Sequence, residues 1–169
     1  MINMDEAANI VRDSGGRLVG RTRFQKLSYI LEIAGLGAGF NFEYRRFGPY
    51  SDELNLSTRD ARLLGLLDEE ERGTDWGGTF SIFTTQERAR DDVNPSRIRL
   101  AQIAIAADPV ELELAATALF LHLDGYSDAW TETARRKPQK AKDQRIEKAK
   151  ALYQKIRRVD TPIALPEVA

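Results

Sequence analysis

Carboxylates and a single histidine are the side chains through which this 169-residue chain could carry acid–base or metal chemistry, because it contains no cysteine. Paired carboxylates occur at Asp52–Glu53 and at Asp91–Asp92. The members of each pair are sequence neighbours, so one member is better explained as a helix cap or as a partner of the helix dipole. His122 lies in a phenylalanine- and leucine-rich run, which is typical of a packed side chain. We therefore predict no catalytic residue and no metal site.

Phosphate-binding glycine motifs are also missing from the sequence. Gly35, Gly37 and Gly39 have the spacing of a dinucleotide-binding loop, but they follow an expected helix, whereas that motif requires a preceding strand. The chain has no P-loop lysine motif, no HExxH and no GxSxG. We predict that the protein is not an enzyme and needs no cofactor, and the sequence identifies no small-molecule substrate.

Basic and aromatic residues point to binding instead of catalysis. They mix at the start of one expected helix and along the aromatic segment after it, a combination found on nucleic-acid-binding surfaces. The candidate binding residues, for a protein or a nucleic acid, are Arg21, Arg23, Lys26, Tyr44, Arg45, Arg46 and Tyr50. A second basic face is expected near the C-terminus, with Arg135, Arg136, Lys137, Lys140, Arg145 and Lys148.

Charge is segregated along the chain, although the net charge is only −1. Residues 17–50 carry six basic and two acidic side chains, and residues 129–158 carry eleven and three. Residues 51–76 carry three basic and eight acidic side chains, and residues 109–128 carry none and four. The acidic block at 51–76 holds the helix and the hairpin that a winged helix presents to DNA. Since duplex binding depends on neutralising phosphates, this distribution favours a protein partner over a nucleic acid.

Hydrophobic periodicity and turn residues predict the elements that position these side chains. Helices are expected over 5–13, 22–34, 52–64, 85–91, 97–107, 109–124, 128–137 and 139–158, with Thr22, Ser51, Asp108 and Ser127 as helix caps. Alternating aromatics from Phe40 to Phe47 predict a strand, and Gly48–Tyr50 predicts a turn. Two short strands, one in the acidic stretch after Leu66 and one at 79–84, predict a hairpin.

This order of elements predicts a mainly α protein with a small β-hairpin, in the α+β class. We expect a winged-helix-like unit at residues 1–95, a helical extension packed on it at 96–158, and a flexible tail at 159–169. No apolar run approaches the ~18 residues of a membrane span, and the first residues lack the apolar core of a signal peptide. We therefore expect a cytoplasmic protein with no membrane partner.

Two blocks of sequence carry a family resemblance. The first comprises RTRFQKLSYIL at residues 21–31 and FGPYSDEL at residues 47–54, with an aromatic-rich stretch between them. The second comprises LELAAT at residues 112–117, Phe120–Leu121 and Arg136–Pro138. The sequence resembles the YwgA-like family, which is related to the SocA/Panacea antitoxin domain and shares its QKL-x-Y helix and its aromatic-Gly-Pro turn. The tight link from Gly35 to Gly39 and the long basic C-terminus depart from that pattern.

The resemblance implies a winged-helix-like, mostly helical fold without known catalytic residues. It also implies a role as a binding or neutralising module in bacterial toxin–antitoxin or anti-phage systems. We therefore expect a non-enzymatic, antitoxin- or defence-associated module that binds a partner protein or self-associates. The alternative is a nucleic-acid-binding, winged-helix-like regulator. Two interpretations of Lys26 stay open. It ties its helix to the Gly48–Pro49 segment through a hydrogen bond, or it joins Tyr50 and the neighbouring arginines in a binding face.

Overall fold

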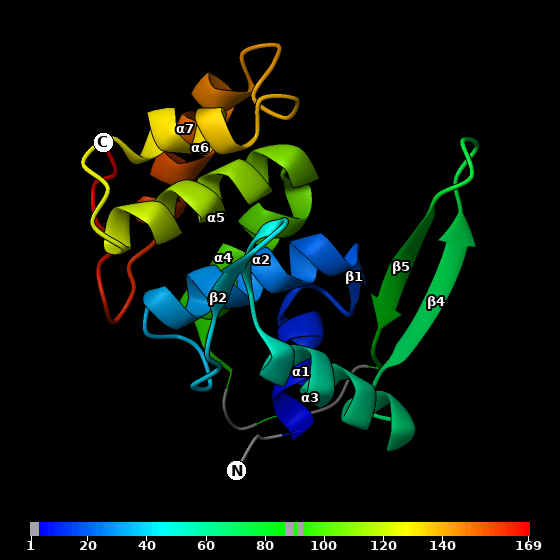
Figure 1. Ribbon diagram of the computed structural model, residues 1–169. Coiled ribbons are helices and arrows are strands. Elements are labelled where there is room, and N and C mark those ends of the chain that lie inside the picture. The colour runs from blue at the N-terminus through cyan, green and yellow to red at the C-terminus, as the bar shows by residue number, and fades with distance from the viewer. Residues whose placement is uncertain (1–3, 87–89, 91–92) are drawn as a thin grey trace.

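The first half of the chain combines three helices with a three-stranded antiparallel sheet (Figure 1). The computed structural model describes residues 4–86, 90 and 93–169. In chain order the elements are α1 (Met4–Asp13), β1 (Arg17–Val19), α2 (Arg21–Ile33), α3 (Asp52–Leu63), β4 (Asp68–Gly73) and β5 (Thr79–Thr84). The strand order β1-β5-β4 is that of a winged helix. A two-stranded hairpin, β2 (Glu43–Arg45) and β3 (Gly48–Tyr50), is inserted between α2 and α3.

The second half is helical and is centred on one buried helix. Its elements are α4 (Pro95–Ala106), α5 (Pro109–Leu123), α6 (Ala129–Arg136) and α7 (Arg145–Arg157). Helix α5 contacts α2, β3, α6 and α7, and every residue from Leu112 to Leu119 is buried. Figure 1 shows α5 lying between α2 and the pair α6 and α7. The predicted α+β class is confirmed, and the predicted boundary between residues 95 and 96 stays a prediction.

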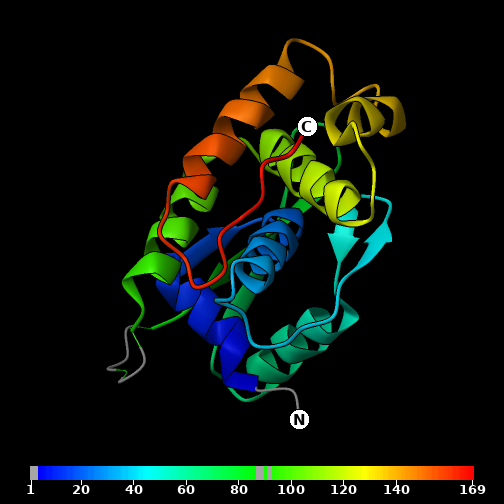
Figure 2. The ribbon, with the colours of Figure 1, turned by 90° about the vertical axis from the view of Figure 1, so that its left-hand side faces the viewer.

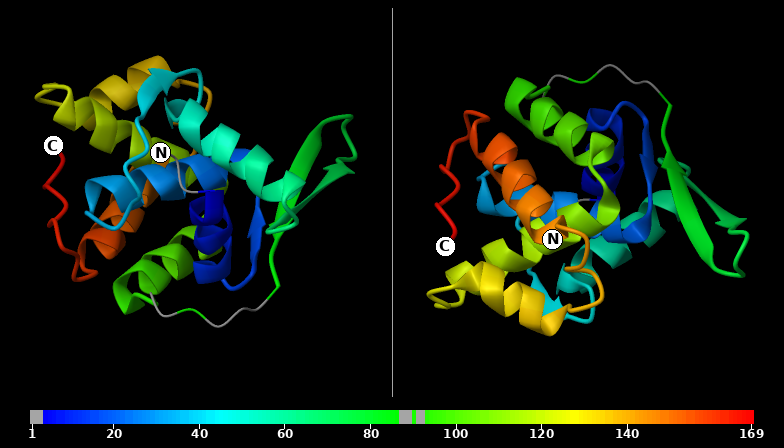
Figure 3. Two further views of the ribbon diagram at one scale, coloured as in Figure 1. Left: turned by 90° about the horizontal axis from the view of Figure 1, so that it is seen from below. Right: turned by 90° about the horizontal axis from the view of Figure 1, so that it is seen from above.

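The β4–β5 hairpin extends away from the body of the protein (Figure 3). Its base is anchored in the core, where the rings of Phe83 and Phe24 meet edge to face with centroids 5.0 Å apart. At its tip, the Thr74 hydroxyl accepts a hydrogen bond from the Gly78 amide at 2.9 Å and closes the turn. Because the hairpin projects from the body, residues 70–73 and 75–79 in its outer half are exposed to solvent.

Helix α3 begins at the cap that the sequence predicts. Ser51 is fully buried and its Oγ accepts a hydrogen bond from the Leu54 amide at 3.1 Å. The backbone amide of Ser51 donates to Gln25 Oε1 at 2.8 Å, and its carbonyl accepts from Gln25 Nε2 at 3.0 Å. The Gln25 side chain thus holds the start of α3 against α2, and the Ser51 side chain caps α3 itself.

We expect Ser51→Ala to lower the free energy of unfolding by about 0.5–2 kcal/mol, because the Leu54 amide loses its buried acceptor. Urea denaturation measures this change. Ser127→Ala is the matched control, since Ser127 is exposed and the cap of α6 is Asp128, whose carboxylate accepts from the Thr131 amide at 3.1 Å. Equal destabilisation by both substitutions would contradict the capping role of Ser51.

The structure corrects several local predictions. The predicted caps Thr22 and Ser127 are wrong, since α2 starts after Gly20 without a side-chain cap and α6 starts after Asp128. Gly48–Tyr50 is a strand and not a turn, because it pairs with Glu43–Arg45 in the β2–β3 hairpin. Strand β1 was not predicted, since three residues are too few for a periodic pattern.

The predicted basic helix over 139–158 begins later than expected. Asp143 and Gln144 have φ angles of 59° and 62°, in the left-handed region, which interrupts a right-handed helix. Residues 138–144 form turns, and α7 starts at Arg145. The predicted helix over 85–91 is absent at residues 85, 86 and 90, and the rest of that prediction lies outside the described residues.

Residues 159–169, expected to form a flexible tail, instead lie along the body of the protein (Figure 2). The Ile163 amide donates to the carbonyl of Ala34 at the end of α2, at 3.0 Å. Leu165 is buried, and the carbonyls of Pro166, Val168 and Ala169 accept from Tyr153 Oη, Trp130 Nε1 and the Ala129 amide. The segment therefore links the C-terminal end of α2 to α7 and α6.

Candidate functional site

Most of the predicted binding residues use their charged groups inside the protein. Arg23 shows this most clearly. Its guanidinium donates to the carbonyls of Val19, Ala104, Ile105 and Ala107, at 2.6–3.0 Å. The carbonyls of Ala104, Ile105 and Ala107 lie at the C-terminal end of α4, where backbone acceptors lack partners within the helix. Burial lowers the pKa of the Arg23 guanidinium, and the negative charge of Asp108 partly opposes this lowering. Arg23 is thus a cap for α4 and not part of a free basic surface.

Lys26 lies in a buried cluster of opposite charges that the sequence did not predict. Only 1% of Lys26 is exposed, and its Nζ donates to the Pro49 carbonyl at 2.8 Å. The Glu113 carboxylate, on α5, contacts the ammonium groups of Lys137 at 3.1 Å and Lys140 at 2.7 Å. We call Lys26, Lys137, Lys140 and Glu113 the lysine–Glu113 cluster.

The cluster holds the β2–β3 hairpin against α2 and α5. Lys137 Nζ donates to the Arg46 carbonyl at 3.1 Å, and Lys140 Nζ lies 4.6 Å from the centre of the Phe47 ring. The pKa of Lys26 is lowered to about 8, chiefly by burial and also by the charges of Lys137 and Lys140, while the Glu113 charge opposes the lowering. These contacts support the interpretation in which Lys26 ties its helix to the Gly48–Pro49 segment.

A second group of predicted residues forms an aromatic–cationic cluster on the surface. The Arg136 guanidinium lies 4.9 Å from the centre of the Tyr44 ring and 5.2 Å from that of Tyr126. It also donates to Glu132 at 2.8 Å, and Arg135 pairs with the same carboxylate at 2.5 Å. Hydrogen bonds from both arginines lower the pKa of Glu132 to about 2. Much of the positive charge of Arg135 and Arg136 is therefore offset within α6.

The remaining predicted residues are divided between pairs and open surface. Arg21 pairs with Glu69 at 2.6 Å, and Arg45 pairs with Glu43 and Asp52. Arg21, Lys26 and Tyr50 together line a cavity of about 320 Å³. Three phenylalanines also line it, Phe24, Phe47 and Phe83. The side chain of Arg46 is exposed beside Phe47, while Arg145 and Lys148 lie on α7. The predicted residues thus form several separate clusters and not one basic face.

No family model, curated protein or solved structure matches the chain. Within residues 4–86, 90 and 93–169, no three His, Cys, Asp or Glu side chains gather where a metal ion could bind. Over the same described ranges, no helix has the length and apolar character to cross a membrane.

Sequence reasoning missed an apolar surface on α3 and the β4–β5 hairpin. Leu56 and Leu63 lie seven residues apart on one side of α3, and they are 40% and 79% exposed. Leu64, which follows α3, is 58% exposed, and Trp76 at the hairpin tip is 86% exposed. We use the name α3–hairpin face for the three exposed leucines of α3 and its end, Leu56, Leu63 and Leu64, together with Trp76 at the projecting tip of the hairpin. Periodicity did not reveal it, because a leucine at the end of a helix fits a buried position equally well.

Proposed function

We propose that the protein is a non-enzymatic bacterial interaction module that binds a partner protein through the α3–hairpin face. The antitoxin or defence association is part of this proposal and rests on the family resemblance. The observation that carries the binding role is the exposure of three leucines on α3 and at its end, and of a tryptophan at the tip of the hairpin that follows α3 in the chain. Apolar side chains exposed along one side of a helix, like these leucines, are typical of protein–protein interfaces, and tryptophan is enriched among the residues that dominate their affinity.

The charge around the α3–hairpin face indicates the chemistry of the partner. Residues 51–76 carry eight acidic and three basic side chains, and Asp52, Glu70, Glu71 and Asp75 are exposed. Complementary charge speeds association and selects partners. The proposed partner therefore presents basic side chains around an apolar contact.

The same charges argue against the alternative of duplex recognition through the winged-helix elements. Phosphates would meet an acidic helix and an acidic hairpin. The basic residues nearest to these elements do not compensate. Lys26 is buried, and Arg21 and Arg62 both pair with Glu69.

The test is co-expression of the chain with the product of the neighbouring gene in its source genome, followed by calorimetric titration of the purified pair. We expect a complex that survives high salt, because packed apolar contacts supply its core. Leu63→Glu and Trp76→Ala should each lower the affinity by about thirtyfold or more. Leu123→Glu is the control, since Leu123 is 52% exposed at the end of α5, outside the face.

Two further measurements complete the test. Duplex DNA should bind with a Kd no tighter than about 10⁻⁶ M at physiological salt. Sub-micromolar, sequence-dependent duplex binding would overturn the proposal in favour of a regulator. A dimer of the chain alone, dissociated by Leu63→Glu, would assign the face to a second copy and not to a different protein.

A further inference from the structure

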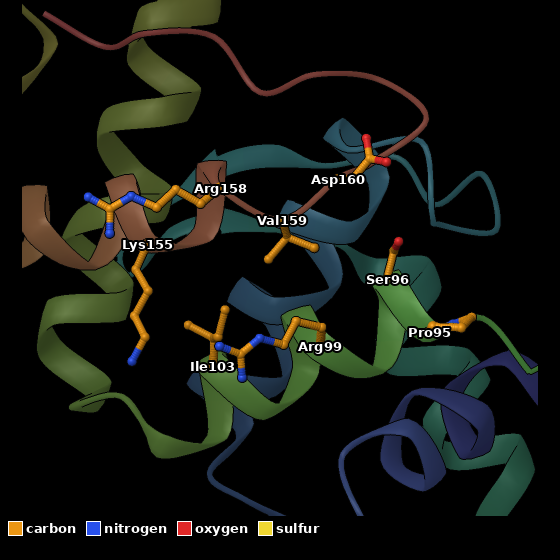
Figure 4. Close-up of a pocket in the computed structure, with 8 residues that line it drawn as sticks. All are labelled: Pro95, Ser96, Arg99, Ile103, Lys155, Arg158, Val159 and Asp160. Atoms are coloured by element: carbon orange, nitrogen blue, oxygen red, sulfur yellow. The ribbon is translucent and has the colours of Figure 1, made fainter.

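A cavity of about 470 Å³ lies between α4 and the C-terminal end of α7, away from the residues that the sequence singles out (Figure 4). Its volume falls in the range of small-molecule sites. Ile103 and Val159 supply its apolar lining. Arg99, Lys155 and Arg158 supply its positive charge.

Within the described residues, these three cations have no paired counter-charge. Across the part of the chain that the structure describes, Arg99, Lys155 and Arg158 take part in no ion pair within 4.0 Å. Among the described residues that line the cavity, Asp160 is the single acidic one, which leaves a local excess of positive charge. Figure 4 shows the Lys155 and Arg158 side chains at one end of the cavity and Asp160 beside Ser96 at the other. The lining is thus polarised, with its positive charge displaced toward one end.

Helix stabilisation explains only part of this arrangement. Lys155 lies in the last turn of α7 and Arg158 follows it, where the helix dipole favours cations. Arg99 lies in the N-terminal half of α4, where the dipole does not favour a cation. Arg97, its neighbour on α4, is paired with Glu6 and Asp13, whereas Arg99 is exposed. All three cationic side chains are exposed around the cavity, so an anion bound there would meet positive charge from both helices.

Side chains, and not the backbone of α4, are available to such an anion. Asn94 caps α4, and its Oδ1 already accepts from the amides of Ser96 and Arg97 at 3.0 and 3.2 Å. Two of the three cations are arginines, whose planar forks match phosphate oxygens in bidentate hydrogen bonds. Ser96 and Asp160, at the other end, offer acceptors for hydroxyl or amino hydrogens.

We propose that this cavity binds a nucleotide phosphate, with the phosphate against Arg99, Lys155 and Arg158 and the sugar or base against Ile103, Val159 and Asp160. The ligand is a free nucleotide or the end of a nucleic-acid strand, since both present the same phosphate and sugar chemistry. The site is independent of the α3–hairpin face.

Equilibrium dialysis with three probes tests the proposal: ATP, inorganic pyrophosphate and a short oligothymidylate. We expect saturable binding of ATP or of the oligothymidylate, and weaker binding of pyrophosphate, which lacks the sugar and base. Tighter binding of ATP identifies a free nucleotide, and tighter binding of the oligothymidylate identifies a strand end.

Arg99→Glu and Lys155→Glu should each lower the affinity for the tighter probe about tenfold or more, because each removes a charge-assisted hydrogen bond. Arg99→Lys should recover only part of the loss, since it restores the charge without the fork. Lys142→Glu is the matched control, because Lys142 is exposed in the turns before α7 and does not line the cavity. Urea denaturation establishes that each variant is folded.

Absence of saturable binding by all three probes would overturn the proposal. An equal loss of affinity in Lys142→Glu would overturn it as well, because binding would then follow the net charge and not the cavity. Tighter binding of a tetraglutamate peptide than of either nucleotide probe would reassign the cavity to an acidic protein segment.

Discussion

Glu113→Gln is expected to lower the free energy of unfolding by about 3–5 kcal/mol, the cost typical of removing one partner from a buried ion pair. Glu113 is 2% exposed, and its carboxylate contacts the ammonium groups of Lys137 and Lys140. It is also the charge that opposes the lowering of the Lys26 pKa. Without it, Lys26, Lys137 and Lys140 have no carboxylate of the described residues within ion-pair distance. Urea denaturation at neutral pH measures the change.

The pH dependence of this variant separates lost charge from lost packing. In the wild-type protein the Lys26 pKa is about 8, below the value of 10.5 that the unfolded chain takes. The unfolded state therefore binds more protons between these two values, and stability rises with pH across that window. Glu113→Gln should lower the Lys26 pKa further, so the rise should begin at lower pH and be larger.

Glu111→Gln is the control for this prediction. Glu111 lies two residues earlier on α5, is only half-buried, and has no ion pair within the described part of the chain. Its substitution should cost no more than about 1 kcal/mol, the contribution of an acid in the first turn of a helix. Equal destabilisation by Glu113→Gln and Glu111→Gln would show that the lysine–Glu113 cluster does not contribute as proposed.

Gly48→Ala is expected to lower the free energy of unfolding by about 2–4 kcal/mol, since it combines backbone strain with a steric clash. The φ angle of Gly48 is +92°, a conformation that residues with a Cβ rarely adopt. A Cβ at this position would also lie 2.5 Å from Thr117 Oγ1 on α5. The close approach of β3 to α5 therefore requires glycine, and thermal or urea denaturation measures the cost of replacing it.

Two variants separate the strain from the clash. Gly39 has a φ angle of +91°, and a Cβ there would meet nothing within 4 Å, so Gly39→Ala should show the strain alone. Thr117→Ala removes the hydroxyl that an alanine at position 48 would meet, and that buried hydroxyl has no hydrogen-bond partner to lose among the residues that the structure describes. In the Thr117→Ala background, the cost of Gly48→Ala should fall toward that of Gly39→Ala. An unchanged cost in that background would contradict the steric part of the argument.

Local chemistry determined a large part of the fold from the sequence. The Ser51 and Asp108 caps are both observed, because a side-chain acceptor at a helix start acts within three residues of chain. The buried stripe of α2, with Leu27, Ile30 and Leu31, follows the helical period. The acidic hairpin was predicted from alternation and from the glycines of its turn. Each of these features depends on residues that are neighbours in the chain.

Only the tertiary structure decided what the basic residues do. Arg23 caps a helix that lies about eighty positions later in the sequence, and Lys137 reaches the carbonyl of Arg46 across 91 positions. A basic residue has the same appearance in the sequence whether its charge is paired or free, because its partners come from distant segments. Gly48–Pro49–Tyr50 likewise has the composition of a turn, and pairing with β2 made it a strand. The cavity lined by Arg99, Lys155 and Arg158 exists only because α4 and the end of α7 pack together, which no local pattern in either helix encodes.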